Sequence, residues 1–164
     1  MALRASPGYT LSEIMVTVAI IGMLTATASP LLVNMVNFWR QTTARASIQR
    51  DVRASLDTIN RFARQAQSNT VAVDRLAGQP PFSRLTFTII QGQTVSFYQQ
   101  GNRLFMRRGS NVSLLASNIA YIAFAFPRTD DVTLLTVAIT AQSATFLGGS
   151  KALQLSIQKV RIMN

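Results

Sequence analysis

Hydrophobic and polar positions change their spacing along the chain, and each change predicts a different element. No charged residue occurs from Ile14 to Trp39, a run of 26 residues, which exceeds the roughly 20 that a helix needs to cross about 30 Å of hydrocarbon. A core helix of a soluble protein normally keeps a polar face, and this run has none. The run therefore predicts a membrane-spanning helix, which ends at Trp39 and Arg40, an interfacial aromatic and a cation.

A second helical pattern follows, with one apolar stripe in place of the continuous apolar run. Its apolar residues recur at intervals of three and four, which is typical of an amphipathic helix: Ile48, Val52, Leu56, Ile59, Phe62 and Ala66. Pro30 removes one backbone donor and clashes with the preceding turn, so a kink or an opened turn is expected there. The two patterns together predict one long helix from about Leu11 to about Gln67.

The second half of the chain has the period of two that is typical of strands. A linker containing Gly78, Pro80 and Pro81 precedes it. A hairpin is predicted around Gly92, and the alternation slips near Gln158, which predicts a β-bulge there. The expected strands cover residues 84–91, 94–99, 103–107, 112–115, 119–126, 132–141 and 153–162. A helix followed by such strands predicts an α+β fold, in which one face of an antiparallel meander packs on the apolar stripe.

Composition excludes most enzyme classes. The chain has 16 Lys and Arg against six Asp and Glu, a net charge of +10, and 14 of the cations are Arg. It has no His and no Cys, which excludes disulfides, Cys or Ser–His nucleophiles and the usual zinc sites. Asp130 and Asp131 are adjacent and indicate a polar turn, and residues 148–151 lack the spacing of a phosphate-binding loop. We therefore expect no catalytic, metal or cofactor site.

The start of the chain resembles a known signal. Residues 8–13 read Gly-Tyr-Thr-Leu-Ser-Glu and lead into the apolar run, which resembles the class III signal of type IV pilins and type II secretion pseudopilins. The resemblance implies that a prepilin peptidase cuts between Gly8 and Tyr9 and methylates the new amine of Tyr9. It also implies that Glu13 registers each subunit against its neighbour in a filament. Gly22 and Pro30 fall where such proteins carry residues that loosen or kink the helix.

The second half resembles the minor subunits of this superfamily. The segments 115–119, 121–126 and 160–164 are similar to those of J-type pseudopilins and W-type minor pilins. The resemblance implies a non-enzymatic minor subunit of a secretion pseudopilus, a pilus or a competence filament, in the tip or initiating complex. Its partners would be other pilin subunits, the prepilin peptidase and the inner-membrane assembly platform.

This resemblance also implies an order of segments along the chain. Residues 1–8 are the leader peptide, 9–39 the transmembrane and filament-core helix, 40–77 the amphipathic stem and 78–164 the sheet domain. The subunit would cross the bacterial inner membrane once, with its C-terminal domain outside the cytoplasm, before it enters a filament. The arginines just beyond the span outnumber Arg4 before it, which by the positive-inside rule favours the opposite orientation.

Two alternatives remain open from the sequence. Arg4, the apolar stretch and Ala26-Thr27-Ala28 also fit an ordinary secretory signal, which would leave a chain starting at Ser29. The second alternative is a secreted or membrane-anchored basic module that binds DNA or another polyanion. Its candidate surface combines cations with aromatic rings: Arg103, Arg107, Arg108 and Arg128 with Tyr98, Phe105 and Tyr121.

Overall fold

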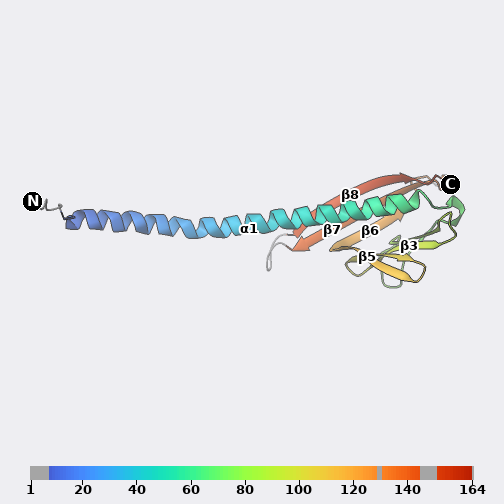
Figure 1. The fold of residues 1–164 in the computed structure, drawn as a ribbon, viewed down its shortest axis with the longest axis horizontal. Coiled ribbons are helices and arrows are strands. Elements are labelled where there is room, and N and C mark those ends of the chain that lie inside the picture. Colours follow the sequence, from blue (N-terminus) through green and yellow to red (C-terminus); the bar gives the residue numbers. More distant parts are fainter. Residues whose placement is uncertain (1–7, 129–130, 145–150, 164) are drawn as a thin grey trace, which may run out of the picture. The chain divides into compact units, whose positions relative to one another are not determined.

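A computed structural model describes residues 8–128, 131–144 and 151–163 of the chain. These residues belong to two compact units, Met1–Arg40 and Gln41–Asn164. The predicted polar turn at Asp130 and the loop at residues 148–150 lie outside the described residues. Helix α1 (Leu11–Ala63) begins in the first unit and ends in the second, where strands follow it (Figure 1).

In the first unit, α1 is an apolar helix whose described residues are exposed or partly exposed. None of residues 8–40 is buried. The helix is long and apolar enough to cross a membrane by length and composition, with a mean hydropathy of 2.0 over its most apolar window. It continues through Gly22 and Pro30. A kink at these two residues therefore stays a prediction.

In the second unit, the stem of α1 buries the predicted stripe. Six of its buried residues are apolar: Ile48, Val52, Leu56, Ile59, Phe62 and Ala63. The helix ends at Ala63, four residues before the predicted end at Gln67. Beyond it, Gln67 donates its amide to the Thr88 carbonyl at 2.9 Å, and Ile90 donates to Gln65 at 3.2 Å. Pairing with the sheet thus replaces the last helical turn.

A short 3-10 turn and a five-stranded antiparallel sheet follow the helix. The turn is η1 (Ser68–Thr70). The sheet has the order β1-β2-β3-β4-β5. Its strands are β1 (Ala72–Asp74), β2 (Arg84–Thr88), β3 (Thr94–Gln100), β4 (Arg103–Arg108) and β5 (Asn111–Ser117). Strand β1 is not among the predicted strands, whereas the hairpin of β2 and β3 around Gly92 (φ 77°) is confirmed.

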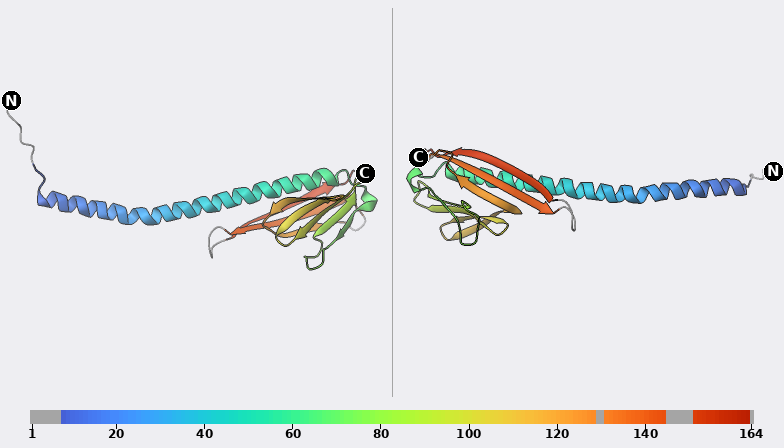
Figure 2. Two further views of the ribbon diagram at one scale, coloured as in Figure 1. Left: turned by 60° about the horizontal axis from the view of Figure 1, so that its bottom comes forward. Right: turned by 180° about the vertical axis from the view of Figure 1, so that it is seen from behind.

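The remaining strands form a separate antiparallel sheet. It has the order β6-β7-β8, with β6 (Ile119–Ala125), β7 (Leu134–Ala144) and β8 (Lys151–Arg161) (Figure 2). The prediction of one continuous meander is therefore wrong, because the chain changes sheet at Asn118. That residue has a positive φ of 62°, and the next amide, of Ile119, donates to the Asn102 carbonyl at 2.9 Å. Within each sheet, neighbours in sequence pair with each other, and the α+β class is confirmed.

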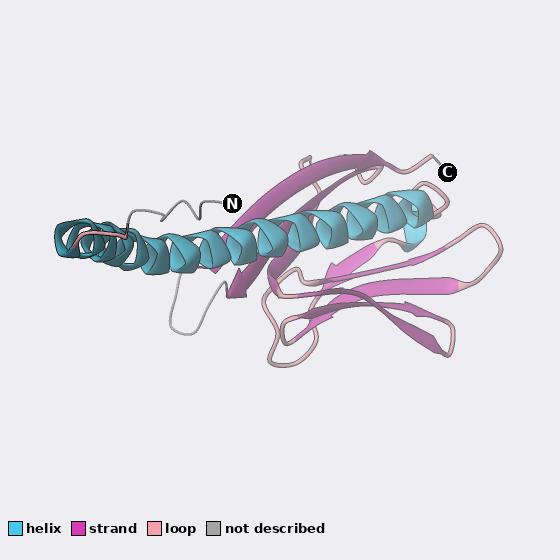
Figure 3. Ribbon diagram, turned by 60° about the vertical axis from the view of Figure 1, so that its left-hand side comes forward, coloured by secondary structure: helices cyan, strands magenta, loops and turns pink. Residues whose placement is uncertain are grey.

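Both sheets and the stem share one hydrophobic core. Figure 3 shows the two sheets as separate layers beside the helix. The ring of Phe62 on the stem lies 6.3 Å from that of Phe97 on β3. The core residues of the strands are fully buried: Leu85, Phe87, Val95, Phe97, Leu104, Ile122, Phe124, Leu135, Val137 and Ile139. One stripe of the helix therefore holds two sheets together.

The predicted bulge near Gln158 is wrong. The register of β7 and β8 runs without a shift from the pair Leu134–Arg161 to the pair Ala144–Lys151. Continuous pairing places Val160 in the core, while Leu155 and Ile157 face solvent. The alternation of apolar residues slips near Gln158 because this regular strand carries apolar residues on both of its faces. The irregularities lie instead at Leu104/Phe105 and at Ile119/Tyr121.

Two isoleucines of the second unit test this packing by the same substitution. Ile59 is 0% exposed in the stem, and Ile157 is 63% exposed on β8. Ile59→Ala should lower the free energy of unfolding by about 2–5 kcal/mol, because it leaves a cavity between the stem and the sheets. Ile157→Ala should cost less than about 1 kcal/mol. Urea unfolding of a fragment starting at Arg40 measures both, and equal losses would contradict a stem packed on the sheets.

Candidate processing and assembly site

The first turn of α1 is held by a reciprocal pair of side chains. The Glu13 carboxylate oxygen Oε2 accepts hydrogen bonds from the Thr10 amide at 2.9 Å and the Thr10 hydroxyl at 3.0 Å. In return, the Glu13 amide donates to Thr10 Oγ1 at 3.4 Å. This arrangement is a capping box, which satisfies backbone donors that the first turn leaves without helical partners. Thr10 and Glu13 therefore fix where the helix begins.

Sequence reasoning missed this role. The spacing Thr-x-x-Glu just before an apolar run is itself the sequence pattern of a capping box. The interpretation from the sequence gave Glu13 a role in assembly only and gave Thr10 none.

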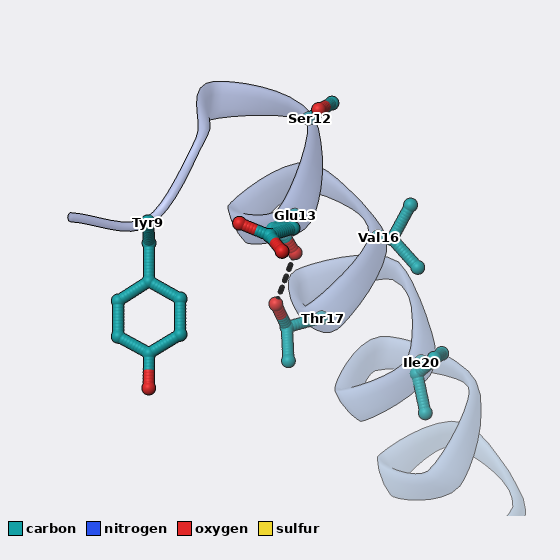
Figure 4. A pocket seen from close by; sticks show the side chains of 6 residues that line it. All are labelled: Tyr9, Ser12, Glu13, Val16, Thr17 and Ile20. Carbon is teal, nitrogen blue, oxygen red and sulfur yellow. Dashed lines mark hydrogen bonds between the residues drawn. The ribbon is translucent and has the colours of Figure 1, made fainter. Parts of the chain in front are cut away.

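The predicted cleavage junction lies in extended chain immediately before this cap. Gly8 and Tyr9 precede α1 and are exposed, Tyr9 by 86%. Figure 4 shows the Tyr9 ring on the same side of the helix start as the Glu13 carboxylate. Six residues line a shallow, open hollow of about 430 Å³ here: Tyr9, Ser12, Glu13, Val16, Thr17 and Ile20. The junction is thus outside the helix and accessible to a second protein.

Glu13 is the one charged residue among residues 8–39, and half of its carboxylate is unused. Thr10 occupies Oε2, and within the described part of the chain no hydrogen bond reaches Oε1. The next charge in sequence is Arg40, 27 residues further along the helix. In a membrane, a carboxylate at the edge of so long an apolar helix carries a desolvation cost that the two Thr10 hydrogen bonds offset at Oε2 only.

The same segment is what a comparison with known families detects. Residues 3–29 match the family model described as the prokaryotic N-terminal methylation motif. The chain carries the methylation signal of type IV pilins and pseudopilins. This signal favours the pilin-type interpretation over an ordinary secretory signal cleaved before Ser29. No curated protein matches the chain.

The methylation signal carries consequences for the kind of protein. It indicates a structural subunit rather than an enzyme, since it implies processing by a prepilin peptidase and assembly with other pilin subunits. The signal and the apolar helix agree with a single-pass subunit anchored in the inner membrane. Within the described residues, no group of three or more acidic side chains could hold a metal ion.

The structure divides the basic aromatic surface that the sequence suggested. Tyr98 and Phe105 stack with ring centroids 5.7 Å apart, and Arg107 lies on the same face of the five-stranded sheet. Arg108 points to the other face, where its guanidinium carbon lies 5.9 Å from the centroid of the Phe62 ring. Tyr121 belongs to the other sheet, as its strand β6 shows. The seven residues therefore do not form one surface.

Asp131, the described half of the Asp130-Asp131 pair, stabilises a turn. Its Oδ1 accepts hydrogen bonds from the amide and the hydroxyl of Thr133. These bonds, helped by the nearby charges of Arg128 and Arg161, hold the pKa of the Asp131 carboxyl below its usual value. The carboxylate thus has the turn-forming role that the sequence predicted.

The capping box predicts an effect of a near-isosteric change. Thr10→Val removes the hydroxyl and should destabilise the first turn by about 1 kcal/mol, which raises amide exchange of residues 10–13 about fivefold. Thr10→Ser keeps the hydroxyl and should leave exchange unchanged. Hydrogen exchange of the full chain in detergent micelles measures both, and equal exchange in all three proteins would mean that Thr10 does not cap the helix.

Proposed function

We propose that this chain is a minor pilin-like or pseudopilin-like subunit, assembled into a type II secretion pseudopilus or a type IV pilus, in its tip or initiating complex. A prepilin peptidase cuts between Gly8 and Tyr9 and methylates the Tyr9 amine. Glu13 then carries assembly. The observation that carries the proposal is the match of residues 3–29 to the methylation motif, which spans the Gly8–Tyr9 junction and the start of an apolar helix with no buried residue from its first turn to Arg40.

The free oxygen of Glu13 supports its role in assembly. A carboxylate costs on the order of 2.5–3.5 kcal/mol at the centre of a bilayer and less near its edge, and a filament core removes still more water from it. A cation must therefore meet it there. Between Arg4 and Arg40 the chain has no Lys or Arg. The amine that cleavage creates on Tyr9 of an adjacent subunit is the nearest cation, and Glu13 Oε1 is free to accept from it.

The charge of the second unit supports a minor rather than a major role. Residues 41–164 contain 14 Lys and Arg and five Asp. Copies of such a unit stacked on one another would repel each other. Neighbours that supply carboxylates remove this repulsion. The chain therefore suits a position that occurs once or a few times among different subunits.

The apolar helix and the folded second unit support the proposed topology. The anchor at residues 9–39 lies in the inner membrane, and the unit that follows lies outside the cytoplasm. Large downstream domains cross the membrane largely regardless of their charge, which is why Arg45, Arg50 and Arg53 do not prevent translocation.

Cleavage and methylation predict one mass for the mature chain. The chain should begin at Tyr9 and carry one methyl group on its amine. Intact-mass spectrometry of the membrane-extracted protein, from cells with and without the prepilin peptidase, measures this. A chain that begins at Ser29 would establish an ordinary secretory signal, and one that keeps Met1 in both strains would establish a plain anchor.

Replacing the carboxylate by an amide separates assembly from insertion. Glu13→Gln should leave membrane insertion and cleavage intact and lower incorporation into sheared filaments at least about tenfold, because a desolvated ion pair is lost. Asp57→Asn makes the same chemical change at an exposed stem position and should not alter incorporation. Quantitative immunoblots of filament and membrane fractions compare the three proteins. Equal incorporation of Glu13→Gln and wild type would remove Glu13 from the assembly mechanism.

A further inference from the structure

Strand β8 is a long edge strand with one open side. Among the described residues it pairs with β7 only, over 11 residue pairs without a register shift. Figure 1 and Figure 2 both show it as the outermost strand of its sheet. An edge of this length offers a row of backbone donors and acceptors to another chain.

The hydrogen bonds between β8 and its neighbour show which residues of β8 direct their backbone groups to the open side. The Ile162 amide donates a hydrogen bond at 2.7 Å to the carbonyl of Thr133, the residue just before β7. The backbone groups of residue 162 therefore point toward β7. In an antiparallel pair the backbone groups of successive residues point to opposite sides of a strand. The amides and carbonyls of residues 155, 157, 159 and 161 therefore point away from β7, toward the open side.

The side chains of these same residues form a graded row on the outer face of the sheet. Leu155 and Ile157 are 62% and 63% exposed, and Lys159 and Arg161 are exposed as well. Across the strand pair, Ile157 lies opposite Ala138, a small neighbour that leaves the face flat. Along the open edge, two apolar side chains are thus followed by two basic ones.

The other exposed edge strand with apolar side chains, β5, is less suited to pairing. Its register with β4 shifts at Leu104/Phe105, and bulges twist an edge away from regular pairing. It has seven residues, and Arg107 of β4 lies opposite its Val112. Strand β8 has no such interruption.

We propose that the open edge of β8 receives a β-strand from a different, acidic subunit. The incoming strand pairs its backbone with residues 155–161 and places apolar side chains opposite Leu155 and Ile157 and carboxylates opposite Lys159 and Arg161. For the identity of the partner as a subunit, this inference rests on the function proposed above. The chemistry of the edge itself does not depend on it.

Charge favours a different, acidic subunit over a second copy of this chain as the occupant. The acidic residues of the second unit are Asp51, Asp57, Asp74, Asp130 and Asp131, and none lies on β8. Asp74, on β1, is already paired with Arg84, which lowers the pKa of its carboxyl. A second β8 would bring two more cations and no carboxylate to an edge that already carries Lys159 and Arg161, so none of these charges would gain a partner of opposite sign.

Capped nine-residue peptides test the edge on the full chain in detergent micelles. In the acidic probe, threonines alternate with two glutamates and then two valines, which matches the row on β8 in antiparallel order. The basic probe has lysines in place of the glutamates. A third probe has the chain's own residues 154–162. Fluorescence anisotropy measures affinity, and hydrogen exchange locates the protected amides.

We expect the acidic probe to bind about tenfold more tightly than either of the other two, and to slow exchange at residues 155, 157, 159 and 161. The double variant Lys159→Glu and Arg161→Glu should reverse the preference between the acidic and the basic probe. Arg107→Glu, on the outer face of the other sheet, should leave the preference unchanged.

Three results would overturn the proposal: equal binding of the acidic and basic probes, an equal reversal by Arg107→Glu, or tightest binding of the chain's own peptide, which would make a second copy the partner. The assay needs neither cleavage nor a filament. Its failure is therefore distinguishable from an unaltered incorporation of Glu13→Gln, which concerns the other end of the chain.

Discussion

An apolar helix surface that the described part of the chain leaves unburied is the constraint on which the rest of the protein depends. None of residues 8–40 is buried by the chain itself, although no charge occurs from Ile14 to Trp39. Water solvates such a surface poorly, at about 25 cal/mol per Å², so it requires lipid or other helices. In the filament that we propose, Glu13 would make contact with other helices selective, because it brings one carboxylate that needs a partner into that contact.

The second unit does not share this constraint, because its apolar surface closes on itself. The stem buries Val52, Ile59 and Phe62 against strands of both sheets. One helix face thus completes two sheets, neither of which has a second layer of its own. The division near Arg40 separates an exposed apolar helix from a unit that has its own core.

How much the sequence predicts depends on whether a residue's environment is local. The apolar run, the stripe from Ile48 to Phe62 and the hairpin around Gly92 follow from spacing and turn chemistry, and the structure confirms them. The helix end, the division into two sheets and the regular β8 depend on tertiary contacts. Gln67, for example, lies outside the helix because its amide donates to the Thr88 carbonyl. Ile157 is apolar but exposed, because it lies on the outer face of its sheet. At the candidate site, the Thr-x-x-Glu spacing is the pattern of a capping box, but the interpretation from the sequence did not use it.

The two ends of the chain present the same physical problem with opposite signs. At Glu13 one anion stands at the edge of a long uncharged helix, and on β8 Lys159 and Arg161 stand at the end of an apolar edge. Each end combines an apolar surface, which binds other apolar surfaces without directional preference, with charged groups that favour a partner of the opposite charge. In the filament that we propose, the anion would hold a neighbour in register and the cations would select it. Because the chain has few acids of its own, the second requirement falls on its neighbours, which is why a mixed assembly suits it better than a homopolymer.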